Sequence, residues 1–200
     1  MIYSVDRSIC FLHMPKTGGK WVSNILFEEM SFWRADSGLY IHSPAIGKGR
    51  DCNYRFGFIR EPVSWYTSLY RFQANPPKAS SENYRFFFDK SLAADNINAY
   101  INNIRKDPYT FLKMEKMYQY IFSIGKRHEC KNIFKFENLA VNLSIALKQG
   151  GLDIDHIIEK HKEKSNVSTH VLEEPLSEST KQYIYESCDH IYKKFNYERG

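Results

Sequence analysis

Hydrophobic residues along this chain form two kinds of pattern: short continuous runs, and longer stretches in which they recur every three or four positions. The short runs are typical of buried strands, and the three-to-four spacing is typical of helices with one buried face. The runs predict strands near 8–14, 38–42, 54–59 and 132–136. The periodic stretches predict helices near 19–32, 62–73, 92–105, 109–124, 139–149, 153–162 and 177–195.

The order of these elements predicts the fold class. Strands alternate with helices, which indicates an α/β three-layer sandwich whose central, mainly parallel sheet is covered on both faces. The 200 residues are enough for one domain with a sizeable core, so we predict a single domain over 1–200. Ligands of such folds bind beyond the carboxyl ends of the strands.

The first predicted strand leads into the sequence Pro-Lys-Thr-Gly-Gly-Lys-Trp, residues 15–21. Gly18 and Gly19 allow a tight turn whose N–H groups point inward. The helix that follows presents the positive end of its dipole to this turn, and Lys16 and Lys20 add full positive charges. The segment is therefore a predicted site for a phosphate-like anion.

The spacing of this loop differs from that of the nucleotide-triphosphate P-loop. That motif requires Gly, four residues, Gly-Lys, and then Ser or Thr. With its Gly-Lys on Gly19-Lys20, the first Gly would fall on Met14 and the magnesium-binding hydroxyl on Trp21. The glycine pattern of dinucleotide-binding folds is also absent.

The loop does resemble the 5′-phosphosulfate loop of the sulfotransferases, which use 3′-phosphoadenosine 5′-phosphosulfate (PAPS) and carry Pro-Lys-(Ser/Thr)-Gly-(Thr/Gly)-x-(Trp or apolar) here. The resemblance implies that Lys16 stabilises charge on the bridging oxygen as a catalytic residue. It also implies that Trp21 stacks on adenine, although a core aromatic at helical spacing is the alternative. The residues implied to cradle the 5′-phosphosulfate together with Lys16 are Thr17, Gly18, Gly19 and Lys20.

A second segment matches the 3′-phosphate signature of the same family. That signature is an Arg at a strand end, Pro two residues later and Ser eight residues after the Arg, and Arg60, Pro62 and Ser68 reproduce it. An Arg grips phosphate through two hydrogen bonds, and a Ser on the following helix adds a neutral one. A site that binds a 3′-phosphate can reject ATP, which lacks one, because the buried polar groups of the site would then go unpaired.

Two later segments extend the resemblance. Residues 133–139, Ile-Phe-Lys-Phe-Glu-Asn-Leu, are similar to the family's strand followed by Tyr-Glu-Asp-Leu, with Phe136 and Asn138 as departures. The last predicted helix closes on Phe-Asn-Tyr, where the family commonly has Phe-Gly-Tyr. The resemblance thus covers 8–72 and 130–197, and residues 74–128 match nothing specific.

The resemblance places a catalytic base at a strand end a little over twenty residues after the loop Lys. His42 occupies such a position, and a neutral His can take a proton from an alcohol near pH 7. A structural His that caps the loop is the alternative. Asp36, Glu28 and Glu29 are the nearest rivals, and we expect His13 to orient the loop rather than to catalyse.

A late polar loop of the family closes over the 3′-phosphate and adenine. The corresponding candidates for donor binding are Lys164, Ser165 and Asn166. A charged loop between two helices is often only solvated, and this alternative stays open.

Composition limits the partners and the compartment. The net charge of +5 suits an anionic donor, but it is too small and dispersed to indicate nucleic acid. No apolar stretch predicts a membrane span or a signal peptide. The four Cys lack paired metal-binding spacing, so we predict reduced thiols, a cytoplasmic location and no metal.

These observations together predict a PAPS-dependent sulfotransferase that acts on an acceptor hydroxyl of a carbohydrate or small molecule and releases adenosine 3′,5′-bisphosphate. One alternative is a P-loop-type nucleotide-dependent phosphotransferase, which would need a magnesium ligand where Trp21 stands. The other is a protein that binds the nucleotide without catalysis. The identity of the acceptor and the oligomeric state do not follow from the sequence.

Overall fold

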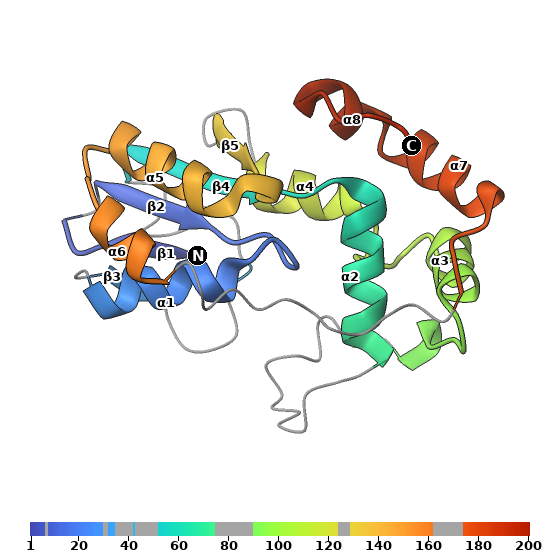
Figure 1. Ribbon diagram of the computed structural model, residues 1–200. Helices are drawn as coiled ribbons and strands as arrows, with labels where there is room; N and C mark the ends of the chain where they lie inside the picture. The colour runs from blue at the N-terminus through green and yellow to red at the C-terminus, as the bar shows by residue number, and fades with distance from the viewer. Residues whose placement is uncertain are drawn as a thin grey trace. The chain divides into compact units, whose positions relative to one another are not determined.

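A computed structural model describes residues 1–6, 8–29, 32–34, 42, 52–74, 90–123, 129–161 and 174–200 (Figure 1). The strands are β1 (Ile2–Ser4), β2 (Ile9–Leu12), β3 (Phe32–Arg34), β4 (Tyr54–Ile59) and β5 (Asn132–Lys135). The α-helices are α1 (Gly19–Glu29), α2 (Pro62–Ala74), α3 (Ile97–Lys106), α4 (Met114–Phe122), α5 (Leu139–Gln149), α6 (Asp155–His161), α7 (Glu178–Ser187) and α8 (Asp189–Phe195). Short 3₁₀ turns η3 (Lys90–Leu92) and η4 (Phe136–Asn138) complete the described elements.

The five described strands form one sheet in the order β3-β1-β2-β4-β5. β2 pairs with β4, and β4 with β5, in parallel, whereas β1 is antiparallel to both β2 and β3. Four of the five strands therefore run in one direction, and only β1 opposes them. The predicted α/β class with a mainly parallel sheet is confirmed.

The sequence pattern did not predict β1 and β3. Each has three residues, which is too short for an alternating pattern to be distinguished from chance. The strand predicted over 38–42 lies outside the described residues except for His42, which sits in a turn.

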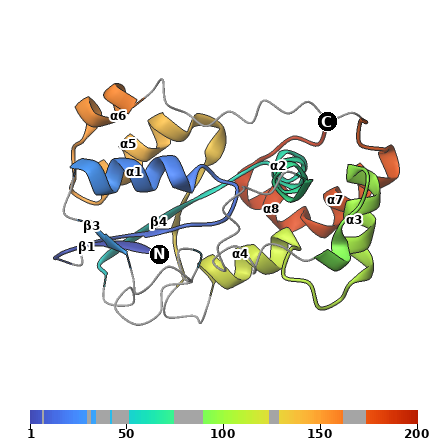
Figure 2. The same cartoon turned by 90° about the horizontal axis from the view of Figure 1, so that it is seen from below.

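One face of the sheet carries the main hydrophobic core of this part of the chain. Phe11 and Phe56 project from β2 and β4 to this face, and their rings stack with centroids 5.3 Å apart. Figure 2 shows α1, α5 and α6 on the same side of the strands. The helical residues that complete this core are Trp21, Val22, Ile25, Leu26, Leu143, Ala146, Leu147, Ile157 and Ile158.

The opposite face is formed by the residues that alternate with these along the strands, since successive side chains of a strand point to opposite faces. Cys10 and Leu12 are fully buried there. Gly57 lies beside Leu12 in the register, and a Cβ at Gly57 would overlap the ring of Phe122 at the end of α4. The glycine thus lets this aromatic ring approach the sheet closely.

The contacts divide the chain into two compact units. The first comprises Met1–Arg60 and Tyr118–Val167, and includes the whole sheet with α1, α5 and α6. The second comprises Glu61–Met117 and Ser168–Gly200, and includes α2, α3, α7 and α8. Each unit is built from two separate stretches of sequence, so neither corresponds to a simple N-terminal or C-terminal domain.

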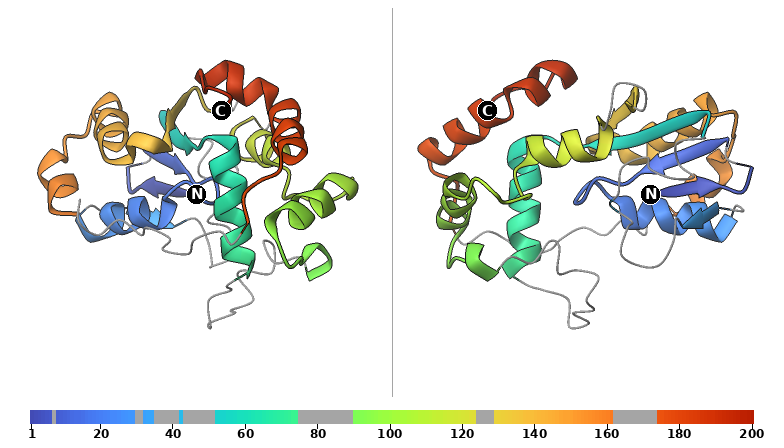
Figure 3. Two further views of the ribbon diagram at one scale, coloured as in Figure 1. Left: turned by 45° about the vertical axis from the view of Figure 1, so that its right-hand side comes forward. Right: turned by 180° about the vertical axis from the view of Figure 1, so that it is seen from behind.

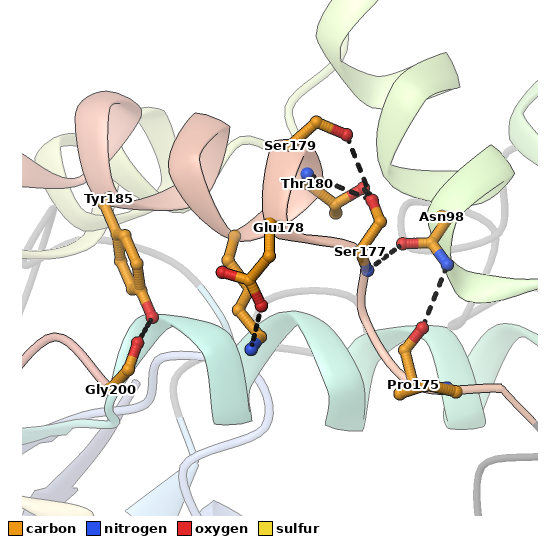
Figure 4. Close-up of polar contacts among 9 residues, drawn as sticks. Asn98, Pro175, Ser177, Glu178, Ser179, Thr180, Tyr185 and Gly200 are labelled. Atoms are coloured by element: carbon orange, nitrogen blue, oxygen red, sulfur yellow. Dashed lines mark hydrogen bonds and ion pairs between the residues drawn. The ribbon is translucent and has the colours of Figure 1, made fainter.

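Two helices of the second unit, α3 and α7, begin at side-chain caps. The Asn96 side chain accepts a hydrogen bond from the Ala99 N–H, which explains why α3 begins at Ile97 and not near residue 92. The Ser177 hydroxyl accepts one from the Thr180 N–H, and the Ser177 N–H donates to the Asn98 side chain (Figure 4). The bond between Ser177 and Asn98 joins the start of α7 to α3.

The final helical stretch differs from the single helix predicted over 177–195. Cys188 has φ −116° and ψ 17°, which is outside the helical region, and it separates α7 from α8 (Figure 3). Its N–H still donates to the Ile184 carbonyl at 3.0 Å, so the chain changes direction without losing that bond. None of the helices in the described part of the chain has the length and apolar character needed to cross a bilayer.

Candidate anion-binding site

The carboxyl ends of three neighbouring parallel strands define the candidate site. The register pairs Leu12 of β2 with Gly57 of β4, and Ile59 of β4 with Lys135 of β5. The segments that leave these ends are the loop 13–18, Arg60 and the turn η4. All three belong to the first unit.

The loop folds back on itself, and two of its residues have a positive φ. Lys16 has φ +64° and Gly18 has φ +73°. The left-handed region costs a residue with a side chain about 1–2 kcal/mol, so Lys16 is held there by its surroundings. The Thr17 side chain is fully buried and its hydroxyl donates to the Met14 carbonyl at 2.7 Å, which closes the turn.

The two glycines of the loop are needed for different reasons. At Gly18 the positive φ disfavours any side chain, and a Cβ would also overlap Leu139 and lie 3.0 Å from the Phe136 ring. At Gly19 the backbone φ is ordinary, but a Cβ would overlap the imidazole of His13. The loop is therefore packed between η4 on one side and the His13 ring on the other.

The start of α1 presents backbone donors. The first hydrogen bond into the helix runs from the Val22 N–H to the Gly18 carbonyl at 3.2 Å. No described residue accepts a hydrogen bond from the N–H groups of Gly19, Lys20 and Trp21. The first turn holds no acidic residue, and Lys20 is exposed there. Such a helix N-terminus favours an anion through its N–H groups and its dipole.

Arg60 reaches from the end of β4 to the same loop. One of its terminal nitrogens (Nη1) donates to the Lys16 carbonyl at 3.4 Å, and its guanidinium lies 4.6 Å from the centre of the Phe136 ring. Burial, and then the charge of Arg60, lower the pKa of Lys16 to about 8. An anion bound between the two cations would offset their repulsion and raise the pKa of Lys16 again.

His42 lies against the start of the loop. Its Nδ1 is 3.0 Å from the carbonyl oxygen of His13, and the centroids of the two imidazole rings are 4.2 Å apart. A carbonyl can only accept, so Nδ1 carries the proton and Nε2 carries the lone pair. Burial is the main cause that lowers the pKa of His42 to about 4, so its ring is neutral at pH 7. This tautomer is the one that a general base needs at Nε2.

Trp21 has a placement other than the predicted contact with adenine. Trp21 is buried in the core of the first unit, 7% exposed, and its indole N–H donates to the His161 carbonyl at 3.1 Å. This placement favours the core-packing alternative over stacking on adenine. Ser68 lies half-buried on α2, in the second unit.

Several predicted positions lie outside what the structure describes. Lys164, Ser165 and Asn166 are among these residues, and so is Asp36. The side chains of Glu28 and Glu29 are not described either.

Two cavities are lined by residues of the second unit only. One, of about 310 Å³, lies at the start of α7 beside α3, where the hydroxyls of Ser177 and Thr180 bond to each other (Figure 4). The other, of about 340 Å³, is lined by Glu61, Lys181 and Tyr185 among others. Neither includes a residue of the loop at 13–18.

Sequence reasoning missed the packing role of Phe136, which contacts Gly18 and supports Arg60. The available signal was its position directly after a strand, like the loop and Arg60. In the sequence it stands out only as a departure from the tyrosine of the family pattern.

Comparisons with protein-family models, with curated proteins and with solved structures found no match to this chain. The sulfotransferase resemblance therefore rests on the loop, the Arg-Pro-Ser spacing and the two later segments. The geometry adds an independent observation: cations, backbone donors and a neutral His gather at one edge of the sheet.

Proposed function

We propose that this chain is a PAPS-dependent sulfotransferase that transfers a sulfuryl group to a hydroxyl of a carbohydrate or small molecule. The observation that carries the proposal is the contact of Arg60 with the loop of Lys16, at 3.4 Å, across two adjacent parallel strands. The two motifs that resemble the family's 5′-phosphosulfate and 3′-phosphate sites meet there. In this proposal the fold is the P-loop-like three-layer sandwich of that family.

The described residues suggest how the first unit would hold the donor. The N–H groups of Gly19 and Lys20 and the ammonium of Lys16 would bind the 5′-phosphosulfate. Arg60 would bind the 3′-phosphate through its fork of donors. The donor acts here as a substrate, and its negative charge would offset the repulsion between Lys16 and Arg60.

The chemistry assigned to the chain's own residues is an in-line transfer. His42 Nε2 takes the proton of the acceptor hydroxyl while the acceptor oxygen forms a bond to sulfur. The bond between sulfur and the bridging oxygen breaks, and the Lys16 ammonium stabilises the negative charge on that oxygen. His42 then loses its proton to solvent. A positioned base of this kind contributes about 100- to 10,000-fold to the rate.

The state of the cysteines supports a reducing compartment, and we extend the proposal to a cytoplasmic enzyme on that ground. All four cysteines, Cys10, Cys52, Cys130 and Cys188, are buried thiols outside any disulfide. Proteins of oxidising compartments commonly use such residues in disulfides.

The proposal is tested by thermal unfolding with adenosine 3′,5′-bisphosphate, compared with ATP plus magnesium and with 5′-AMP. A ligand at 100 times its dissociation constant stabilises by about 2.7 kcal/mol, which for a chain of this size raises Tm by roughly 5–11 °C. We expect this rise with the bisphosphate alone. Arg60→Ala should abolish it, whereas Arg55→Ala, at the opposite end of β4, should retain it.

Each other outcome of this experiment has a definite meaning. A larger rise with ATP and magnesium would replace the proposal with the phosphotransferase alternative. No rise with any of the three nucleotides would reject both. If the bisphosphate binds, transfer of labelled sulfate from PAPS to a panel of sugars and small alcohols tests catalysis, and His42→Ala should remove the transfer without removing the Tm shift.

A further inference from the structure

His13 is a buried residue that the proposed chemistry does not use. It follows β2 directly and is 8% exposed. Its ring lies against Gly19, at the first turn of α1, and its centroid is 4.2 Å from that of the His42 ring. One imidazole therefore touches both the anion-binding loop and the proposed base.

The environment of His13 gives little reason to keep a histidine for stability. Its Nδ1 is buried and has no hydrogen-bond partner among the described residues. Burial first, and then the nearby charges of His42, the Met1 α-amino group and Lys16, hold the pKa of His13 well below its usual range. A buried polar atom without a partner is costly, so an apolar residue of similar size would be at least as stable here.

We propose that His13 is a positioning residue whose ring holds Gly19 and His42 in a fixed mutual arrangement. An anion bound in the loop then changes the environment of the His42 ring. The inference rests on the proposed function. The ring fills the space that a side chain at Gly19 would take, and it forms one wall of the site in which His42 lies. A displacement of the first turn of α1 thus moves His13, and His13 moves against His42.

The contact itself can be tested without any activity. Gly19 has an ordinary φ, so Gly19→Ala should destabilise only because its Cβ meets the His13 ring. We expect a fall in Tm of roughly 4–10 °C for Gly19→Ala, and less than a third of that fall when His13→Ala is also present. Gly150→Ala is the matched control, since its Cβ meets Ile9 and Tyr54, and its effect should be independent of position 13.

The role is tested by NMR of the His42 ring, assigned with His42→Ala. The described groups that bear on the His42 charge are the Met1 α-amino group, Lys16 and the adjacent His13. In the wild type we expect a pKa of about 4, and adenosine 3′,5′-bisphosphate should shift the ring signal. In His13→Ala water would reach His42, so the pKa should rise by one unit or more and the ligand-induced shift should fall at least fivefold. His13→Phe, which restores a ring, should recover most of that shift.

The outcomes separate this inference from the proposed function. If the wild type does not bind the bisphosphate, both fail. If it binds, but the Gly19 and His13 effects on Tm are additive or the ligand-induced shift of His42 survives in His13→Ala, the positioning role alone is overturned. A partial loss of stability in His13→Ala does not affect this test, because the shift is measured on the folded fraction.

Discussion

Two helices of this chain begin directly after a parallel strand and a short turn, and their N-termini are used in opposite ways. At the start of α2 the Glu61 carboxylate accepts hydrogen bonds from the Val63 N–H at 2.9 Å and the Ser64 N–H at 2.6 Å. At the start of α1 no described acidic side chain takes that place, and Lys16 and Lys20 flank the open N–H groups.

Under the proposed function, one local motif serves stability at the start of α2 and binding at the start of α1. Glu61 also accepts a hydrogen bond from the Tyr192 hydroxyl at 2.6 Å, so its carboxylate joins α2 to α8. A carboxylate within the chain satisfies the donors of α2, whereas under the proposed function the donors of α1 bind the anion of the donor substrate. The comparison predicts that substitutions at the first site change stability and those at the second change binding and rate.

The largest effect is expected from Lys16→Met. Removal of the half-buried Lys16 ammonium should lower the rate of sulfuryl transfer by about 100- to 1,000-fold. The free energy of unfolding should not fall, because the substitution removes a half-buried charge that the charge of Arg60 repels. Lys131→Met, on the exposed surface of the same unit, is the control and should keep full activity. Equal loss in both variants would contradict the assignment.

The next effect concerns the start of α2, which the Glu61 carboxylate caps. Glu61→Ala removes two capping bonds and the partner of Tyr192, which should lower the free energy of unfolding by about 1–3 kcal/mol in urea titrations. Glu198→Ala, an exposed carboxylate, should change it by less than about 0.5 kcal/mol. A Glu61→Ala chain as stable as the wild type would show that the cap has no energetic role.

The pH dependence of binding tests the role of Lys16 at the start of α1. Because the pKa of Lys16 is lowered to about 8, its charge is present at pH 7 and is lost as the pH rises through 8. The affinity for adenosine 3′,5′-bisphosphate should be highest near pH 7, where the phosphates of the ligand are ionised and Lys16 is charged, and should fall by up to about tenfold per pH unit above 8. Calorimetric titration of Lys16→Met should show no such fall. A wild-type affinity that holds to pH 9.5 would refute the lowered pKa.

The smallest effect is expected at Lys20. Its side chain is exposed in the first turn of α1, and an exposed ion pair contributes about 0.2–1 kcal/mol. Lys20→Ala should therefore weaken the bisphosphate by about two- to fivefold, measured by calorimetry at low salt. A weakening as large as that of Lys16→Met would mean that the anion lies on the outer side of the helix and not in the loop.

The sequence predicted those features that depend on neighbours along the chain. The starts of α1, α2 and α5 follow from glycine, proline and apolar spacing and were placed at the observed residues. The strands β1 and β3 were missed because three residues give no readable period. The break at Cys188 was missed because the apolar spacing continues through it.

The candidate site was predictable in its residues but not in its contacts. Lys16 and Arg60 were found from motifs, and their meeting at one sheet edge follows from parallel strands. The proton position on His42 and the burial of Trp21 depend on residues that lie far from them in the sequence. The contact of the His13 ring with Gly19 depends on how the whole of α1 packs. Spacing alone contains no signal for such contacts.

The difference between the start of α1 and the start of α2 is tested by the amide NMR spectrum of the chain titrated with adenosine 3′,5′-bisphosphate. An N–H that gains a phosphate acceptor moves downfield, whereas one that already donates to a carboxylate does not. We predict downfield shifts for Gly19 and Lys20, and none of that kind for Val63 and Ser64. Saturation of the titration without a downfield shift at Gly19 or Lys20 would contradict the account.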